Sequence, residues 1–139
     1  MIIYKSGSVF ESSTTALGHC ISHDCALSKG VAKEFRERFG GIDIIREQSA
    51  KVGEVAVLKH HDRVIYCLVT KWLYFQKPKL GAVASALREM KNHMLSNGIS
   101  QVSLPKISSG LDKIPWYKVE GKLKEIFKDS PITVYVYTL

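Results

Sequence analysis

The sequence predicts an α/β protein, a three-layer α/β/α sandwich built around a mixed sheet. Three observations predict this class. Short runs of β-branched and apolar residues alternate with segments whose apolar residues recur every three or four positions. One such helical segment joins the strand-like runs 64–70 and 101–104, an arrangement typical of a right-handed parallel unit. A hairpin that turns at 60–63 adds an antiparallel strand, so the sheet should be mixed.

The expected elements follow one another in an alternating order. Strands are expected, because β-branched and apolar residues dominate, at residues 2–5, 16–21, 54–58, 64–70, 101–104 and 132–137. Helical spacing marks residues 31–39, 83–94 and 119–127, and a short helix is expected at 42–48. Asn97-Gly98 is a typical helix end, and Pro115 suits the first turn of the last helix.

The length and composition indicate one domain over residues 1–139. A chain of 139 residues that is 45% hydrophobic can bury one core. No apolar run approaches the length of a membrane span, and the first residues lack the apolar stretch of a signal peptide. The three cysteines, Cys20, Cys25 and Cys67, show no disulfide-framework spacing. We therefore expect a soluble protein of the cytoplasm or nucleus, with no membrane partner, and we expect a monomer without a cofactor.

The formal net charge of +7 would suit a polyanionic partner such as nucleic acid or a nucleotide-like ligand. Much of the excess lies where helices should face water, for example at Lys33 and Arg36 and at Lys118 and Lys122. No aromatic-basic stripe or nucleic-acid motif accompanies these residues, so a nucleic-acid partner is not expected. A basic nucleic-acid-binding domain stays open as a third interpretation, to be judged by binding that weakens steeply as salt rises.

Two strand ends carry the most informative side chains. The strand at 64–70 runs into Lys71, and the strand at 101–104 is followed by a loop that contains Asp112. The carboxyl ends of parallel strands meet at one edge of a sheet, where open α/β sheets bind their ligands. The pattern therefore predicts an amine and a carboxylate at one crevice, a site suited to nucleophilic or acid–base chemistry.

Simpler roles for both residues stay open. Lys71 can be a surface lysine, because an ordinary lysine is almost entirely protonated at pH 7 and then cannot attack a substrate. The apolar side chains at 72–75 would have to shield it from water, or they form a lid or part of the core. Asp112 can be a turn carboxylate or the N-cap of the helix near Pro115.

Two loops at the same sheet edge have the composition of anion-binding loops. The segment 106–111 places serines and a glycine after a buried-looking strand, although a plain turn accounts for this pattern equally well. The segment 28–31 opens a helix, and the amino terminus of a helix favours anions. Together, the two loops suggest a diphosphate ligand.

The segment 19–25 contains five potential metal ligands but matches no familiar zinc spacing. No second ligand cluster completes it, so no metal site is expected. Strand alternation should place His19 and Ile21 on one face of the sheet and Cys20 and Ser22 on the other. A cysteine nucleophile paired with a histidine of this segment is disfavoured, because no third group is evident to orient the pair.

Six motifs spread along the chain form one set. They are His19-Cys20-Ile21-Ser22-x-Asp24-Cys25, Phe39-Gly40-Gly41, Gly53-Glu54-Val55-Ala56-Val57-Leu58-Lys59, Tyr66-x-Leu68-x-Thr70-Lys71, Gly110-Leu111-Asp112 and Val136-Tyr137-Thr138-Leu139. Over almost the whole chain, the set resembles a macro domain. More specifically, it resembles the terminal ADP-ribose protein glycohydrolases, small enzymes that remove ADP-ribose from acidic side chains.

The resemblance implies roles for individual residues. Lys71 would attack the anomeric carbon of the distal ribose, and Asp112 would assist proton transfer and release. The implied ligand contacts come from Ser8, Val9, Ser22, Ser28, Lys29, Gly30, Val31, Thr70, Ser108, Ser109, Gly110, Leu111, Tyr137 and Leu139. The implied partners are ADP-ribose and ADP-ribosylated proteins, with O-acyl-ADP-ribose as a further substrate for deacylation.

Three places depart from the family pattern. Ser8 replaces the aspartate expected on the adenine, Ser28-Lys29-Gly30-Val31 replaces Gly-Ala-Gly-Ile in the first diphosphate loop, and Ser108-Ser109-Gly110-Leu111 replaces Gly-Cys-Gly-Leu in the second. A Cβ is costly where the backbone is left-handed or a phosphate comes close. The alternative is therefore a module that binds ADP-ribose or a related nucleotide without turnover. Lys29 either meets the diphosphate or fills the pocket.

Overall fold

The computed structural model describes residues 1–27, 29–110 and 112–139. The strands are β1 (Ile2–Ser6), β2 (Ala16–Ser22), β3 (Val55–His60), β4 (Arg63–Lys71), β5 (Gln101–Pro105) and β6 (Thr133–Thr138). The helices are the short 3₁₀ helix η1 (Val9–Glu11), α1 (Gly30–Phe39), α2 (Ile42–Glu47), α3 (Leu80–Ser96) and α4 (Trp116–Phe127). Every expected strand and helix is present, with ends that shift by a few residues. Helix η1 was not predicted.

The six strands form one mixed sheet in the order β1-β6-β5-β2-β4-β3. The β3–β4 pair is antiparallel and closes at His60 and Arg63, as predicted, and the pairs β1–β6, β6–β5, β5–β2 and β2–β4 are parallel. The strands β4 and β5 are not neighbours, because β2 lies between them: Ala16 of β2 pairs with Val64 on one side and Val102 on the other. Both strands nevertheless point in the direction of β2, so their carboxyl ends share one edge.

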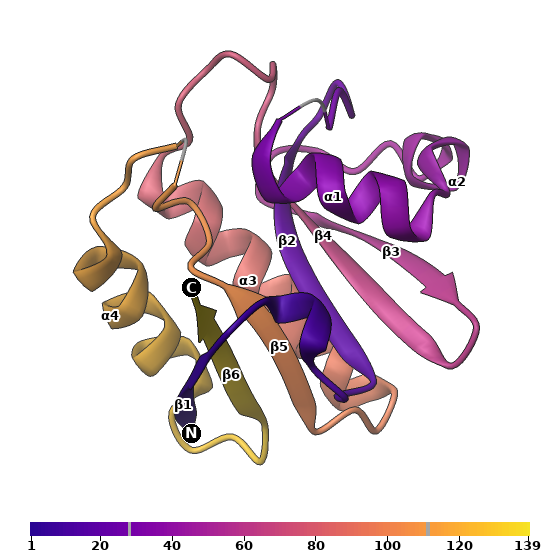
Figure 1. Ribbon diagram of the computed structural model, residues 1–139. Helices are drawn as coiled ribbons and strands as arrows, with labels where there is room; N and C mark the ends of the chain where they lie inside the picture. The colour runs from indigo at the N-terminus through magenta and orange to yellow at the C-terminus, as the bar shows by residue number, and fades with distance from the viewer. Residues whose placement is uncertain (28, 111) are drawn as a thin grey trace.

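Helices cover both faces of the sheet, which makes the fold a three-layer α/β/α sandwich (Figure 1). One core lies between the sheet and α3 and α4, and the other lies between the sheet and the elements η1, α1 and α2. The apolar stripes that predicted the helices are the faces turned to these cores. In α3 the stripe includes Val83, Leu87, Met90 and Met94, and all four side chains are fully buried.

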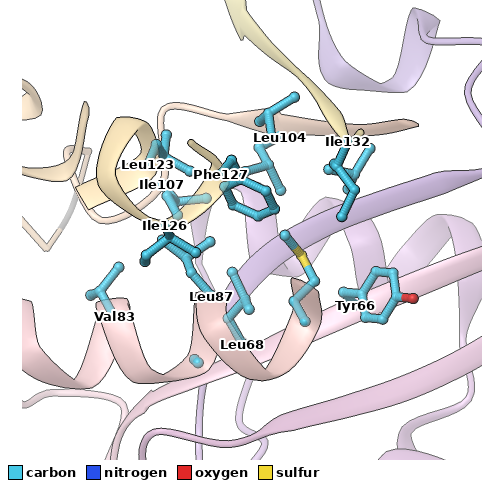
Figure 2. Close-up of a cluster of buried hydrophobic side chains, with 14 of the residues drawn as sticks. Tyr66, Leu68, Val83, Leu87, Leu104, Ile107, Leu123, Ile126, Phe127 and Ile132 are labelled. Carbon is cyan, nitrogen blue, oxygen red and sulfur yellow. The ribbon is translucent and has the colours of Figure 1, made fainter. Parts of the chain in front are cut away.

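Figure 2 shows side chains of the first core gathered from α3, α4 and the sheet. Leu87, Leu104, Leu123 and Phe127 are all at most 2% exposed. The packing is tightest at Gly18 in the central strand β2, where an added Cβ would lie 2.6 Å from Leu104 Cδ2. A glycine is required there because two packed layers meet over the middle of the sheet.

The ends of two helices follow the sequence signals closely. Helix α3 ends at its C-cap Asn97, and Gly98 has the left-handed φ of 67° that glycine tolerates. Pro115 is the N-cap of α4 and thus precedes its first turn, one position earlier than expected. Within the described part of the chain, no helix is long and apolar enough to cross a membrane.

Candidate functional site

Three loops at the carboxyl edge of the parallel strands enclose a cavity of about 540 Å³. They follow β2, β4 and β5, and Figure 1 shows them on the upper side of the view. The described lining residues are His19, Cys20, Ile21, Ser22, Leu27, Lys29, Gly30, Val31, Ala32, Thr70, Lys71, Tyr74, Phe75, Gln76, Lys77, Pro105, Lys106, Ile107, Ser108, Gly110 and Asp112. The cavity lies where open α/β sheets bind ligands, and its volume suits a nucleotide-sized molecule.

Lys71 and Asp112 meet in this cavity. The distance between Lys71 Nζ and Asp112 Oδ1 is 2.6 Å, and each side chain is 15% exposed. Lys71 ends β4, and Asp112 lies in the loop between β5 and α4. A lysine that is this covered and paired is not an ordinary surface lysine. Asp112 does not cap α4 either, because Pro115 holds the N-cap position.

The apolar segment after Lys71 is not a buried wall. Trp72, Leu73, Tyr74 and Phe75 are 51%, 41%, 51% and 69% exposed, so they neither join a core nor shield Lys71 from water. Tyr74 and Phe75 instead line the cavity where it opens to solvent. The close electrostatic partner of Lys71 is therefore Asp112, not a hydrophobic wall.

Asp24 ties the end of β2 to the loop after β4. Its carboxylate accepts hydrogen bonds from the Ser22 hydroxyl and from the backbone N–H groups of Ala26 (3.3 Å) and Tyr74 (3.0 Å). Partial burial raises the pKa of Asp24, but these hydrogen bonds outweigh it and the pKa is lowered overall. The backbone adds a further contact, because Asp24 N–H donates to the Trp72 carbonyl oxygen at 3.1 Å.

His19 and Cys20 line the cavity from opposite faces of β2. His19 packs beside the α1 core, where its ring stacks on Phe35 with centroids 3.9 Å apart, and Ile21 belongs to the same core. Cys20 packs against the α3–α4 core instead, as strand alternation predicted. Ser22 breaks the alternation, because a register shift separates Ile21 from Ser22.

Neither His19 nor Cys20 carries charge at neutral pH. Complete burial lowers the pKa of His19 to about 3, and burial raises the pKa of Cys20 to about 12. Burial also raises the pKa of Cys25, which makes a cysteine nucleophile unsuitable here. Among the described residues, no group of three or more histidine, cysteine or acidic side chains is arranged to hold a metal ion.

The two presumed anion loops differ in backbone strain. Gly30 has a φ of 61°, which glycine adopts freely, and it opens α1. Ser108 has a φ of 60°, so a residue with a Cβ occupies a left-handed position in the loop after β5. Its hydroxyl lies 3.4 Å from Cys20 Sγ. Lys29 is exposed and lines the cavity, so it does not fill it.

Half of the implied ligand contacts line the cavity and five others do not. The lining residues among them are Ser22, Lys29, Gly30, Val31, Thr70, Ser108 and Gly110. The residues away from its lining are Ser8, Val9, Ser109, Tyr137 and Leu139. The remaining two, Ser28 and Leu111, lie outside the described residues.

The five residues away from the lining have other surroundings. The Ser8 hydroxyl accepts from Phe10 N–H at 3.2 Å and caps η1, whose Val9 is buried in the core. The Ser109 hydroxyl donates to the Ile114 carbonyl oxygen at 2.7 Å. The side chain of Tyr137 packs against the α1 core, and Leu139 is fully exposed, so its side chain contacts little of the protein.

Several lining residues were not predicted. They include Leu27, Ala32, Gln76, Lys77, Pro105, Lys106 and Ile107. Lys77 and Lys106 share a signal that would have found them, because each follows the carboxyl end of a parallel strand within a few residues. Leu27 and Ala32 carry no such signal, since an apolar residue near a helix start is usually part of a core.

Comparisons with known proteins agree with this fold and this edge. The model of the family described as "Macro domain" matches residues 14–123. Two proteins named "ADP-ribose glycohydrolase OARD1", from Homo sapiens and Bos taurus, are each 41% identical over 139 residues, which cover 99% of this chain and 91% of each relative. The macrodomain of Mycobacterium tuberculosis DarG superimposes with a TM-score of 0.92 at 21% identity, covering 100% of this chain and 98% of that one. This chain belongs to the macro domain family.

Proposed function

We propose that this protein is an ADP-ribose glycohydrolase that releases ADP-ribose from acidic side chains of modified proteins, with Lys71 as nucleophile and Asp112 as acid–base partner. The observation that carries this proposal is the 2.6 Å contact between Lys71 Nζ and Asp112 Oδ1 in a cavity of about 540 Å³. Two relatives of nearly full length, each 41% identical, are named ADP-ribose glycohydrolases, which supports the same reaction class.

The pair is arranged for transfer of one proton. A lysine attacks only as the neutral amine, so the ammonium must first lose a proton. Asp112 Oδ1 is the acceptor at hydrogen-bond distance, and the proton moves along this contact. The amine lone pair then forms a bond to the anomeric carbon of the distal ribose, while the bond from this carbon to the acceptor oxygen breaks. The electron pair of the broken bond leaves with the acceptor carboxylate, which needs no proton at neutral pH.

Release of the sugar requires a second displacement. Water adds to the anomeric carbon, the bond to Lys71 Nζ breaks, and the freed amine takes up a proton. Asp112 is placed to return the proton that it accepted in the first step, which restores the starting ion pair. O-acyl-ADP-ribose, which presents an ester near the same ribose, would use this cavity as well.

The charges around the cavity suit a diphosphate. Four lysines and one aspartate line its described part, and the aspartate is paired with one of these lysines. Lys29 precedes Gly30 at the amino terminus of the ten-residue helix α1, where free backbone N–H groups favour anions. The diphosphate would then lie between α1 and the loop that holds Ser108 and Gly110.

The test is release of ADP-ribose from a protein mono-ADP-ribosylated on glutamate. Wild type should release it, whereas Lys71→Ala should not and should form no covalent adduct. Asp112→Ala should still bind the ligand, and it should lose turnover or accumulate a lysine–sugar adduct visible by intact-protein mass spectrometry. Matched controls are Lys59→Ala on β3 and Asp62→Ala in the β3–β4 turn, both exposed, which should behave as wild type. Equal rates for wild type and Lys71→Ala, or full activity of Asp112→Ala, would refute these roles.

A binding module without turnover is the second candidate. The observation that favours it is Ser108, which places a Cβ at a left-handed position where the family pattern has glycine. Calorimetric titration with ADP-ribose separates the two candidates. Heat of binding without release from modified protein supports the binding module, and release supports the enzyme.

A further inference from the structure

The exposed aromatic side chains Trp72, Tyr74 and Phe75, here called the aromatic lip, lie on the loop that directly follows Lys71. Tyr74 and Phe75 line the mouth of the cavity and are 51% and 69% exposed. A macromolecule that carries ADP-ribose is too large for a cavity of about 540 Å³, so it must extend from the anomeric carbon into solvent. The lip borders the opening beside Lys71, so the acceptor would contact it.

The lip is held in place by hydrogen bonds. Tyr74 N–H donates to Asp24 Oδ2 at 3.0 Å, and a turn is closed by Gln76 N–H to the Leu73 carbonyl oxygen at 3.0 Å. The Gln76 side chain also accepts from Leu73 N–H at 2.9 Å. Since the backbone is already fixed, binding a ligand to these rings costs little conformational entropy. The Tyr74 and Phe75 rings meet edge to face with centroids 5.5 Å apart, which leaves aromatic surface open to solvent.

Positive charge surrounds the lip. Lys29, Lys77 and Lys106 line the same cavity mouth and are exposed. Among the residues that the structure describes, no carboxylate lies within ion-pair distance of any of the three. The nearby carboxylates are engaged, because Asp24 accepts hydrogen bonds from the loops and Asp112 pairs with Lys71. Exposed aromatic faces beside unpaired lysines are what proteins use to bind unpaired nucleic-acid strands.

We propose that the aromatic lip is a subsite for an unpaired nucleic-acid strand, in which a base stacks on Tyr74 or Phe75 and the flanking phosphates meet Lys77 and Lys106. A strand that is itself ADP-ribosylated would then be an acceptor for the reaction, and this last step rests on the proposed function. An acidic peptide would satisfy the lysines, but it offers the rings nothing to stack on. Paired bases of a duplex keep their faces covered, so a duplex would contact the lysines alone.

The proposal differs from the expectation drawn from the helix faces. Along the chain, Lys29 and Lys106 lie far from the aromatic residues at 72–75, and no stripe is visible. The fold brings them to one cavity mouth, because the loops after β2, β4 and β5 share the carboxyl edge of the sheet.

The test is fluorescence anisotropy with a labelled, unmodified single-stranded DNA of about 12 nucleotides at low salt. Wild type should bind, and Tyr74→Ala/Phe75→Ala should weaken binding at least about fivefold, the factor expected from loss of one stacked base. Tyr117→Ala is the matched control, because Tyr117 lies on α4, away from the described cavity lining, and is 69% exposed, like Phe75. It should bind as wild type. If the double variant does not fold, Phe75→Ser alone, at a largely exposed position, replaces it.

The charge contribution is read from the salt dependence. Lys77→Gln/Lys106→Gln should reduce the slope of log K against log salt by roughly 1.4, the value for two lost phosphate contacts on a single strand, whereas Lys51→Gln/Lys59→Gln should leave it unchanged. A duplex of the same sequence should bind more weakly than the strand. The proposal is overturned by absence of strand binding at low salt, by equal affinity of wild type and the lip variant, or by a glutamate-rich peptide that displaces the strand at equal charge.

The two proposals fail in different ways. Strand binding uses unmodified DNA and does not require hydrolysis, so it is measurable in Lys71→Ala. Binding of the strand by a protein that never releases ADP-ribose from modified glutamate would refute the hydrolase and leave the lip standing. Release without strand binding would do the reverse.

Discussion

Acidification should destabilise this protein through His19, because its imidazole is buried with no charged partner. The side chain is 3% exposed and stacks on Phe35, and among the described residues Nδ1 has no hydrogen-bond partner. Burial lowers the pKa of His19 to about 3, whereas an unfolded histidine titrates near 6.5. As the pH falls below 6.5, the unfolded chain takes up a proton that the folded chain refuses until about pH 3. Stability from this residue is therefore complete above pH 6.5 and is lost on the way down to pH 3.

The size of the effect follows from these two values. Between pH 7.5 and pH 4.5, the unfolded state gains about 3 kcal/mol relative to the folded state from His19 alone. For a domain with a typical unfolding free energy of 5–15 kcal/mol, this is a large fraction. Other carboxylates add to the loss, Asp24 among them, so the contribution of His19 must be isolated by difference.

The assay is urea unfolding at pH 7.5, 6.0 and 4.5 for wild type, His19→Leu and His61→Asn. Leucine removes the titrating group and keeps an apolar side chain in the core, so the loss of unfolding free energy between pH 7.5 and 4.5 should be smaller than in wild type by about 3 kcal/mol. His61 is an exposed histidine in the β3–β4 turn with a φ of 54°, which asparagine tolerates, and its variant should follow wild type. Parallel stability curves for wild type and His19→Leu would show that the reasoning is wrong.

Two further predictions concern the loops of the site. Asp24→Ala removes the acceptor of three hydrogen bonds, so it should lower stability by about 1–3 kcal/mol and speed amide hydrogen exchange at Tyr74, with exchange in α4 as the internal control; unchanged exchange at Tyr74 would contradict the proposed anchoring. Ser108→Gly relieves a left-handed φ of 60° and should stabilise the fold by about 1 kcal/mol in thermal unfolding, despite loss of the contact with Cys20. A destabilised Ser108→Gly would mean that this contact outweighs the strain.

The sheet and the meeting of Lys71 with Asp112 could be predicted because both follow from period and strand direction. Alternation and β-branched residues mark the strands, and parallel strands must bring their carboxyl ends to one edge. Sequence could not show that β2 lies between β4 and β5. Strand order depends on which faces pack best in the assembled core, and no local pattern records it.

The apolar run 72–75 shows the other limit. Hydrophobic composition suggested a wall, a lid or a core, but the hydrogen bonds of Tyr74 and Leu73 fix a turn that points these side chains outward. Such bonds depend on Asp24, which is about fifty positions away, so local composition cannot reveal the exposure. The residues implied at Ser8 and Tyr137 failed to reach the described lining for a similar reason, because capping and core packing engage them.

The position of β1 has a consequence for how the chain is made. This strand lies at the edge of the sheet and pairs with β6, from Ile2 opposite Val134 to Ser6 opposite Thr138. During synthesis β1 leaves the ribosome first, yet its partner strand emerges last among the six. Until then, β1 presents unpaired backbone groups that can join another chain. A nascent chain stalled before β6 would therefore be prone to aggregation at its first strand, although the strands around the cavity had already been synthesised.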